Sequence, residues 1–524
     1  MSRLVSLREA AGAIPDGALL TLGGFDIQRA PMALLRELVR QRRRGLRLIG
    51  PPNPLAHDLL VGAGAAEAID FGFLGFQYEG GFVVAPNLRR AIERSAVCWH
   101  ERDVYEIVQS LRASAFGLPF LAAPGDQASD YLRANATPRV TGPDGGAPVP
   151  VARAVRPDVA ILHAQEADRS GNLRIDDPYA EALQAAASLS VIASAERIVE
   201  RVELPTVPGD RVDLVVEAPR GAFPTSCHLR YPHAAGHLAA YVALAGEDRF
   251  ADYLKHYLFE TDGEAGFLKL AEADKAPAPP PAAAERHAAI DRLVVLLART
   301  VEDGAVVTTG VASALPMLAI GLAKATRAPR ATYINCVGAI DPGGPAASFN
   351  SVDVRLLQGC RARIALPDLF DLARQGRIDQ MFFGAAQIDR AGRMNLTCLG
   401  DYARPTVKLP GPAGSSAMRP YVRKVVGLLP RQAARSLVER VDFATSTPAA
   451  GNRETLVVTD LALLRLEAGE MRTVTRHAGV TVEALRAASG FPIEACGGTT
   501  EEPTAAELQA LRKLDPDGIR YRLA

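Results

Sequence analysis

Short apolar runs alternate with stretches of helical spacing along most of this chain. The first run is Leu19–Leu22, and a glycine pair follows it. Beyond Pro31, apolar residues recur three and four positions apart over residues 34–38, which is typical of an amphipathic helix. Later runs at 159–162 and 214–216 are bounded by charged or turn residues and predict buried strands. Strands that alternate with helices predict an α/β fold with a largely parallel sheet.

The opening pattern occurs twice. Residues 16–25 read Asp-Gly-Ala-Leu-Leu-Thr-Leu-Gly-Gly-Phe, and residues 303–310 read Asp-Gly-Ala-Val-Val-Thr-Thr-Gly. A second pair of matching segments begins at Asp168 and Asp389, each with the pattern Asp-Arg-x-Gly. Between the repeats lies a segment rich in Pro and Ala, which favours neither helix nor sheet and predicts an extended linker. We therefore predict two tandem, related α/β domains with largely parallel sheets. Their predicted bounds are 1–272 and 288–524, with the linker at 273–287.

The composition argues against several classes of function. The 524 residues include 59 basic and 59 acidic side chains, so net charge does not suggest a large nucleic-acid or membrane footprint. The amino-terminal segment has no apolar core of signal-peptide length, and no apolar run approaches the roughly 20 residues that span a bilayer. The six cysteines are scattered without a Cys-x-x-Cys pair, which fits reduced thiols and does not support a zinc site. We expect a cytoplasmic protein that binds no metal, membrane or nucleic acid.

A cysteine stands at the end of a predicted strand in the second half. Residues 332–341 read Thr-Tyr-Ile-Asn-Cys-Val-Gly-Ala-Ile-Asp. This segment resembles the strand-to-loop segment of class I CoA-transferases of the glutaconate type, in which a Glu-Ser-Gly or Glu-Asn-Gly triplet supplies the catalytic carboxylate. Here the triplet is Cys336-Val337-Gly338. The glycine of the motif is kept at Gly338, and a cysteine stands in place of the glutamate nucleophile.

The resemblance extends over most of both halves. The first half is similar to the A-type subunit of that family, notably over residues 156–172 and 212–227. The second half resembles the B-type subunit, over residues 383–397 and 400–414. The resemblance implies that two units on one chain hold an acyl-CoA substrate between them, with no tightly bound cofactor. Fusion gives one unit an effective concentration of roughly millimolar for the other. We also expect a two-fold homodimer of fused chains.

The resemblance implies a set of functional residues. In the family, a glutamate attacks the thioester to form an acyl-glutamyl anhydride, and N–H groups of Gly-rich loops stabilise the oxyanions. Substrate or CoA contacts are then expected at Gly23, Gly24, Gly338, Gln387, Gly411 and Gly414. Plain turn geometry explains the glycines equally well. A cysteine that attacked a thioester would form another thioester, so the anhydride route is closed. Cys336 is either a nucleophile for hydrolysis or a small buried residue at a strand end.

One subgroup of the family lacks the glutamate of the B half. Its members hydrolyse carbon–carbon bonds in cyclic CoA thioesters during steroid ring breakdown and use a glutamate of the A half to activate water. Residues 100–106, ahead of a Leu-Pro-Phe-Leu stretch, resemble that region. Glu101 is the best match for the base, and Asp103 and Glu106 are alternatives. Solvation and the dipole of a following helix explain such an acidic cluster without catalysis.

Three functions remain open from the sequence. The first is an acyl-CoA hydrolase that cleaves a thioester or a carbon–carbon bond, and the missing glutamate favours it. The second is a true CoA-transferase that passes CoA to a carboxylic acid with a relocated nucleophile. The third is a non-catalytic acyl-CoA binder. Arg29 is a candidate partner for a substrate carboxylate, because guanidinium binds carboxylates bidentately, unless it is an ordinary surface arginine.

Overall fold

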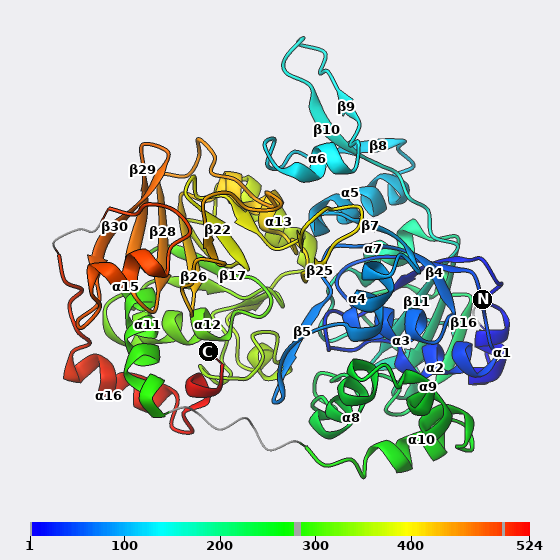
Figure 1. Cartoon of the computed structure of the whole chain (residues 1–524). Coiled ribbons are helices and arrows are strands. Elements are labelled where there is room, and N and C mark those ends of the chain that lie inside the picture. Colours follow the sequence, from blue (N-terminus) through cyan, green and yellow to red (C-terminus); the bar gives the residue numbers. More distant parts are fainter. Residues whose placement is uncertain (1–2, 277–283, 495–497, 524) are drawn as a thin grey trace.

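The computed structural model describes residues 3–276, 284–494 and 498–523, which form two α/β halves side by side (Figure 1). The middle of the expected linker, 277–283, and Cys496 lie outside the described residues. The first half is built on an eight-stranded sheet in which all neighbouring strands are parallel. In sheet order its strands are β1 (Arg3–Leu4), β16 (Leu214–Glu217), β14 (Ser190–Ala195), β11 (Val159–Ala164), β2 (Leu19–Leu22), β3 (Leu46–Ile49), β4 (Ala66–Phe71) and β7 (Cys98–Glu101).

Helices connect these parallel strands and cover the sheet. The helix predicted after Pro31 is α2, and it buries Leu34, Leu35 and Leu38 against the core, as its spacing indicated. Every residue of β11 is buried, which explains why this strand reads as a continuous apolar run. The helices of this half are α1 (Leu7–Gly12), α2 (Met32–Arg40), α3 (Pro54–Gly62), α4 (Pro86–Glu93), α5 (Val104–Ala115), α6 (Asp130–Ala134), α7 (Glu181–Ala187), α8 (Ala235–Gly246), α9 (Phe250–Tyr253) and α10 (Gly263–Ala271).

The second half contains a nine-stranded mixed sheet. Its five central strands are parallel, and antiparallel strands flank them at both edges. The order is β20 (Ala362–Arg363), β19 (Ala339–Ile340), β18 (Thr332–Ile334), β17 (Val306–Thr309), β21 (Gln380–Gly384), β26 (Lys424–Leu429), β28 (Glu454–Thr459), β29 (Ala462–Glu467) and β30 (Glu470–Arg476). The helices are α11 (His287–Arg299), α12 (Ala314–Thr326), α13 (Leu366–Arg374), α14 (Ser415–Met418), α15 (Val482–Ala487) and α16 (Ala505–Leu514). The predicted fold class is confirmed.

The repeated Asp-Arg-x-Gly motif forms the same turn in both halves. Asp168 ends β12 (Glu166–Asp168), and its Oδ1 accepts hydrogen bonds from the N–H groups two and four residues further on. Asp389 ends β22 (Gln387–Asp389) and accepts from the same two positions. Each turn lies in a three-stranded side sheet. The partner strands are β13 (Leu173–Arg174) and β15 (Ile198–Val199) in one half, and β23 (Met394–Asn395) and β27 (Leu437–Val438) in the other.

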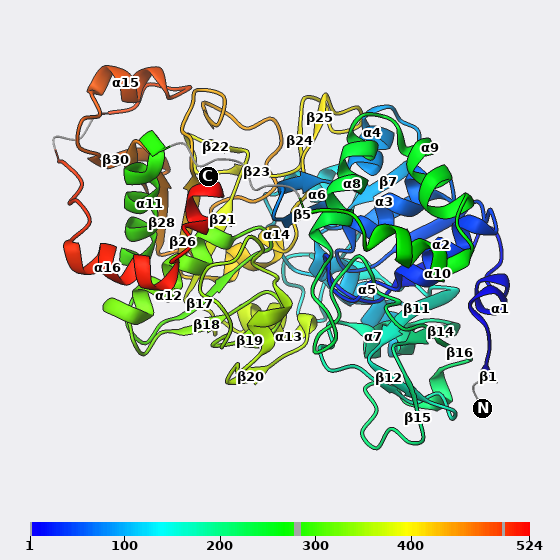
Figure 2. The same cartoon turned by 90° about the horizontal axis from the view of Figure 1, so that it is seen from below.

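Two parts of the first half reach onto the second. A lobe that projects at the top of Figure 1 contains α6 and a small sheet, and Asp130 of this lobe accepts a 2.8 Å hydrogen bond from Ala444 N. The hairpin that contains β5 (Gly75–Tyr78) and β6 (Gly81–Val84) lies between the halves in both views (Figures 1 and 2), and next to it Leu74 N donates to Pro410 O at 2.6 Å. The small sheet of the lobe consists of β8 (Phe120–Ala122), β10 (Val149–Arg153) and β9 (Arg139–Val140). The second half also contains the strand pair β24 (Cys398–Leu399) and β25 (Val407–Lys408). Among the described residues, none of the helices has the length and apolar character needed to span a bilayer.

Candidate active site

The loop that follows β2 turns sharply before α2 begins. Phe25 and Gln28 exchange two backbone hydrogen bonds of 2.9 Å. A Cβ on Gly24 would lie 2.5 Å from Gln28 O, and φ there is +86°, so this position requires glycine. Asp26 and Arg29 also have positive φ, of 56° and 49°. L-residues adopt this conformation rarely, and surrounding contacts have to hold it.

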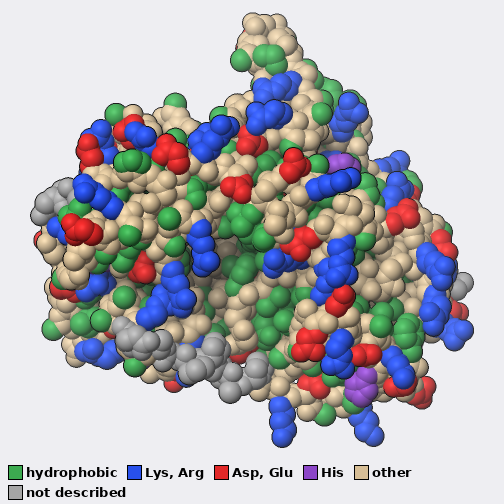
Figure 3. Space-filling model, in the orientation of Figure 1, with side chains coloured by type: hydrophobic (Ala, Val, Ile, Leu, Met, Phe, Trp, Pro, Cys, Tyr) green, Lys and Arg blue, Asp and Glu red, His purple; other side chains and the backbone are tan. Residues whose placement is uncertain are grey.

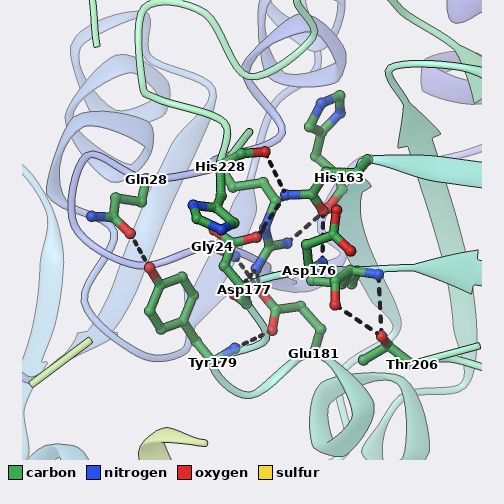
Figure 4. A network of polar contacts seen from close by, with 12 residues as sticks. Gly24, Gln28, His163, Asp176, Asp177, Tyr179, Glu181, Thr206 and His228 are labelled. Carbon is green, nitrogen blue, oxygen red and sulfur yellow. Dashed lines mark hydrogen bonds and ion pairs between the residues drawn. The ribbon is translucent and has the colours of Figure 1, made fainter. Parts of the chain in front are cut away.

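A buried ionic network holds the loop in place (Figure 4). Glu181, at the start of α7, accepts hydrogen bonds from Gly24 N at 2.9 Å and from Arg29 Nη2 at 2.5 Å. Arg29 Nε donates to Asp177 Oδ1 at 2.8 Å, and its Nη1 donates to His163 O at 2.8 Å. The Arg29 side chain is 0% exposed. The structure therefore gives Arg29 protein carboxylates as partners, in place of the substrate carboxylate that the sequence suggested.

Cys336 lies in a tight turn between β18 and β19. Gly338 N donates to Asn335 O at 2.9 Å, and Asn335 Oδ1 accepts from Val337 N at 2.9 Å. Gly338 has a φ of +83°, and a Cβ there would lie 2.0 Å from Ile364 O. Turn geometry alone thus accounts for this glycine. The turn leaves Cys336 buried, with 5% of its surface exposed.

Asp26, in the loop of the first half, lies within electrostatic range of Cys336, in the turn of the second half. Burial raises the pKa of the Cys336 thiol, and the charge of Asp26 raises it further. Burial also raises the pKa of Asp26 well above its ordinary value, and the neighbouring Asn350 side chain opposes this shift only in part. The environment thus favours the protonated form of both groups. A neutral thiol is a poor nucleophile, whereas both groups are able to donate protons.

Glu101, the predicted base, ends β7 and is fully buried between the halves. Lys408 Nζ donates to Glu101 Oε1 at 2.9 Å, and both side chains are 0% exposed. Burial raises the pKa of Glu101 to about 7, although Lys408 opposes the shift. Gly411 packs on this pair, because a Cβ there would lie 2.6 Å from Glu101 Oε1. The structure therefore brings Glu101 and Gly411 together, in a buried contact between the halves.

The two alternative carboxylates lie beyond Glu101, at the start of α5. Asp103 caps this helix by accepting from Tyr105 N at 2.9 Å, and it also accepts from Ser416 Oγ of the second half at 2.6 Å. Burial raises the pKa of Asp103 to about 6 and that of Glu106 to about 7. Both residues line a small cavity of about 40 Å³. The acidic cluster thus supplies a helix cap, Asp103, and two residues that line a cavity, Asp103 and Glu106.

A larger apolar cleft opens between the halves. Its volume is about 380 Å³. Phe73, Phe82 and Val84 line it from the first half, and the second half contributes the loop 310–313 and Gly414 among others. Figure 3 shows apolar side chains in the hollow between the halves. This cleft is large enough for the acyl and thioester part of a CoA derivative.

Hydrogen bonds connect the wall of the cleft with the Cys336 turn. Ser313 N, in the cleft wall, donates to Ser351 Oγ at 3.0 Å. The carbonyl oxygen of Ser351 in turn accepts from Asn335 Nδ2 at 2.9 Å. Asn335 directly precedes Cys336, so the cleft and the Asp26–Cys336 pair belong to one region of the contact between the halves.

The other two predicted contact residues have mainly structural surroundings. A Cβ on Gly23 would lie 2.9 Å from Leu162 Cδ2, which places this glycine against the neighbouring strand. Gln387 is buried on β22, where its Nε2 donates to Asp442 Oδ1 at 3.2 Å. Of the predicted set, Cys336 lies within electrostatic range of Asp26, Gly24 belongs to the loop that carries Asp26, and Gly414 lines the cleft.

One group of side chains offers ligand atoms of the kinds that metals bind. His163, Glu196 and Cys227 each present one such atom, all within 4.8 Å of one another. His163 Nε2 is already hydrogen-bonded to Glu196 Oε1 at 2.8 Å, and Tyr231 OH donates to the same oxygen at 2.5 Å. Hydrogen bonds within the first half therefore join Glu196 to both His163 and Tyr231.

Sequence reasoning missed Asp26 and Lys408. Asp26 carried one signal, because it follows the Gly-Gly-Phe stretch at a predicted strand end, where ligands of α/β folds bind. Lys408 carried none, because its partner is 307 residues away along the chain.

Comparison with known proteins agrees with the resemblance drawn from the motifs. The family model for coenzyme A transferase matches residues 4–218 and 290–488. One of the two subunits of 3-oxoadipate CoA-transferase from Pseudomonas knackmussii is 30% identical over 284 residues, which are 52% of this chain and 99% of the relative. The cholesterol ring-cleaving hydrolase IpdA subunit from Rhodococcus jostii is 32% identical over 42% of this chain and 78% of its own length. The chain spans 60% of the length of a further relative, from Archaeoglobus fulgidus, with 29% identity.

Two solved structures extend this comparison. The acyl-CoA transferase YdiF from Escherichia coli O157:H7 covers 96% of this chain and 95% of its own, with a TM-score of 0.70 and 15% identity, which shows a shared fold. A single-residue variant of the decarboxylase AibA/AibB is 43% identical over 49% of this chain and 99% of the matched chain, with a TM-score of 0.47. The relatives identified by sequence thus include a transferase and a hydrolase.

Proposed function

Because the chain belongs to the coenzyme A transferase family, we propose that it acts on the acyl part of a CoA thioester and does not transfer CoA. In this proposal the substrate carries a free carboxylate, which leaves as CO₂. The single observation that carries the proposal is the buried pair of Asp26 and Cys336, where burial favours the protonated forms. Such a pair supplies protons, and decarboxylation is a reaction that needs a proton donor and no nucleophile.

Transfer of CoA requires a carboxylate in place of the Cys336 thiol. The acyl-anhydride route needs an ionised carboxylate that attacks the thioester carbonyl. The corresponding turn holds Cys336, and burial raises the pKa of its thiol. A thiol that took up the acyl group would form another thioester, and that species offers no driving force for exchange with a carboxylic acid.

The proposed reaction balances as follows. The bond between the carboxylate carbon and the acyl chain breaks, CO₂ leaves, and the bonding electrons pass into the thioester carbonyl as an enolate. The Cys336 S–H gives its proton to the carbon that lost CO₂. The Asp26 carboxyl then returns a proton to the sulfur and is itself reprotonated from solvent. The net reaction consumes one proton and yields CO₂ and an acyl-CoA that is shorter by one carbon.

The surroundings of Cys336 favour the conversion of a substrate carboxylate into CO₂ and an enolate. Phe25, Val337 and Tyr179 are buried in the same apolar cluster as Cys336. A carboxylate loses solvation when it enters such surroundings, and it regains stability when its charge spreads into CO₂ and an extended enolate. The electrons need a path to the thioester. The proposed substrate class is therefore an acyl-CoA whose carboxylate is attached to the α-carbon of the thioester, or to the γ-carbon when a C=C bond joins the α- and β-carbons.

A panel of acyl-CoA thioesters tests the reaction class. Malonyl-CoA, glutaconyl-CoA and butyryl-CoA are incubated with the protein, and products are followed by mass spectrometry together with free thiol. We expect loss of CO₂ from a carboxylated substrate, no thiol release, and no change in butyryl-CoA. Cys336→Ala is expected to stop the loss of CO₂ while the protein still binds the substrate. Release of CoA, or acyl exchange with added acetate, would contradict the proposal.

Hydrolysis is the second candidate, and specific carboxyl groups favour it. Burial raises the pKa of Glu101 and Glu106 to about 7, which is the range of a general base at neutral pH. Glu106 lines the small cavity and lies 3.7 Å from Arg102 Nη1, whereas Glu101 is ion-paired with Lys408 at 2.9 Å and fully buried. In the same panel, thioester hydrolysis releases free thiol, and carbon–carbon hydrolysis adds the mass of one water. Glu106→Gln and Glu101→Gln then identify the base.

The proposal keeps three expectations from the sequence. The substrate is a CoA thioester, no cofactor is bound tightly, and two fused chains associate as a dimer. Light scattering during size-exclusion chromatography measures the dimer directly, and mass spectrometry of the purified protein under native conditions detects any retained cofactor.

A further inference from the structure

Three consecutive arginines line a small cavity of the first half. Arg42, Arg43 and Arg44 follow the end of α2, and together with the segment 63–65 and Phe259 they surround about 60 Å³. Arg42 has a φ of 55°, so the chain turns sharply at this point. The turn allows neighbours in the sequence to share one cavity, which we call the arginine cavity.

The arginine cavity lies away from the cleft between the halves. Arg43 Nη2 donates to the carbonyl oxygen of Gly12 at 2.8 Å, and Gly12 is the last residue of α1. In Figures 1 and 2, α1 lies on the side of the first half that faces away from the second half. Among the described residues, the linings of the cleft and of the arginine cavity have no member in common. A ligand in this cavity would therefore be separate from an acyl group in the cleft.

The positive charge of the arginine cavity is not compensated by ion pairs. In the described part of the chain, no carboxylate oxygen lies within 4.0 Å of the guanidinium nitrogens of its three arginines. Arginines close to them in the sequence do have such partners. Arg40 Nη1 lies 3.3 Å from Glu264 Oε2, and Arg47 Nη2 lies 3.9 Å from Asp158 Oδ2. The three cations of the cavity are thus available to an anion from outside.

Two contacts hold the guanidinium groups in place before a ligand arrives. The hydrogen bond to Gly12 fixes Arg43, and the Phe259 ring centre lies 4.9 Å from Arg42 Cζ. A carboxylate does lie near Arg44, but Asp16 Oδ1 accepts from the backbone N–H of this residue, at 3.0 Å. Donors that are already ordered lose less conformational entropy when they bind.

Arg43 also has an unused donor. Its Nε is buried and has no hydrogen-bond partner among the described residues. Most buried polar groups in folded proteins have partners, because a donor that leaves water without one loses free energy. The dipole of α2 accounts for basic residues near the end of this helix. It does not account for a cavity between them or for a buried donor without an acceptor.

We propose that the arginine cavity binds a phosphate group, either as inorganic phosphate or as part of a small phosphorylated molecule. Guanidinium groups donate paired hydrogen bonds to phosphate oxygens. A phosphate group carries a charge of about −1.5 to −2 at pH 7, so it matches three cations better than a carboxylate does. Sites that enclose a whole small molecule usually have about 300–1,000 Å³. The arginine cavity therefore holds the phosphate alone, and the rest of a ligand would lie outside, next to the 42% exposed Phe259.

Calorimetric titration of the full chain tests the proposal. The protein, free of CoA compounds, is titrated at constant ionic strength with inorganic phosphate, glycerol 3-phosphate and acetate. We expect one saturable phosphate site per chain and at least tenfold weaker binding of acetate. Tighter binding of glycerol 3-phosphate than of inorganic phosphate identifies a phosphate ester as the ligand, and the reverse order identifies free phosphate. Acetate binding as tight as phosphate binding, or no saturable binding of either phosphate, overturns the proposal.

Variants with one charge removed locate the site. Arg43→Gln and Arg44→Gln should each weaken phosphate binding by about 10–100-fold, as the loss of a charged hydrogen bond predicts. Arg44 is exposed, so Arg44→Gln tests the site even if Arg43→Gln folds poorly. Arg47→Gln is the matched control, because it removes the same charge nearby but outside the cavity. It should change the affinity less than twofold. Equal losses in all three variants would indicate general attraction by surface charge and would contradict a built site.

Butyryl-CoA distinguishes the arginine cavity from the substrate site. Phosphate at saturating concentration should leave the affinity for butyryl-CoA unchanged. Competition between the two would mean that the arginines hold the phosphates of CoA, and it would overturn a separate site. The result does not depend on the proposed reaction, because phosphate binding is measured without turnover.

Discussion

Two buried carboxyl groups lie where the halves of this protein meet, and their surroundings are opposite. Glu101 ends a strand of the first half, and Lys408 of the second half donates to it at 2.9 Å. Asp26 lies on a strained loop, with a φ of 56°, and its carboxyl has the Asn350 side chain as a neighbour. Among the described residues, one oxygen of each carboxyl has no hydrogen-bond partner, Oε2 of Glu101 and Oδ1 of Asp26. Burial raises the pKa of both groups, but only at Glu101 does a buried cation oppose the shift.

We interpret Glu101, which is paired with a buried cation, as a structural carboxyl and Asp26 as a reactive one. A buried ion pair fixes two segments against each other, and the loss of either partner leaves an uncompensated charge. A buried carboxyl without a cation beside it is not fixed to another segment in this way and remains available to a ligand. The sequence favoured Glu101 as the catalytic carboxyl, whereas the geometry assigns the chemical role to Asp26 in our proposal. The experiments below test this contrast.

The largest expected effect is on turnover, from Asp26→Asn. An amide at this position cannot return a proton to the Cys336 sulfur, so kcat should fall by about a thousandfold. The thermal midpoint should stay the same or rise, because the change removes a buried ionisable group. The measurement is CO₂ release from the substrate that the acyl-CoA panel identifies. Full activity in Asp26→Asn would assign the proton supply to another group.

Removal of the buried lysine should mainly affect stability. Lys408→Met leaves Glu101 without its cation in an apolar site, and we expect a loss of about 3–5 kcal/mol in the free energy of unfolding. The double variant Glu101→Gln with Lys408→Met should recover most of this loss, because neither charge remains. Urea unfolding of the three proteins measures the effect. Equal stability of Lys408→Met and the unaltered protein would mean that the pair does not hold the halves together.

The sequence predicted the secondary structure of this chain better than the roles of its charged side chains. The strands at 19–22 and 159–162 depend on residues close in sequence, and the structure has them where periodicity predicted. The position of Cys336 beyond a strand end was likewise visible, because it depends on a short apolar run and one glycine.

The ion-pair partners of the charged residues could not be predicted from the sequence, because they come from distant parts of the chain. Arg29 looked free to bind a substrate, but Asp177 and Glu181, 148 and 152 residues away, enclose it. Glu101 looked like an available base, but its lysine lies in the other half. A single sequence shows that a residue is charged, and only the folded chain shows whether that charge is already compensated.

The dependence of stability on pH should reveal the carboxyl at position 101. Its pKa is about 7 in the folded protein and about 4.3 in an unfolded chain, so the folded state binds the proton more tightly. Stability from this group is therefore present at low pH and is lost as pH rises from about 4.3 to about 7. Glu101→Gln should show a smaller fall in unfolding free energy between about pH 5 and about pH 8. Parallel curves for the two proteins would contradict the raised pKa.

The smallest expected effect comes from an ion pair that also joins the halves but is partly exposed. Arg112 on α5 donates to Asp371 on α13 through Nη1 and Nη2, at 3.1 and 2.6 Å, and the two side chains are 20% and 33% exposed. Water screens this pair, so a double-mutant cycle of Arg112→Ala and Asp371→Ala should give a coupling of about 0.5–1 kcal/mol that shrinks with added salt. Arg249 and Asp252, which are 56% and 57% exposed, provide the control, and their coupling should be smaller still. A coupling at Arg112 as large as that of Lys408 would show that the contact itself, and not burial, determines how strongly a charge pair joins the two halves.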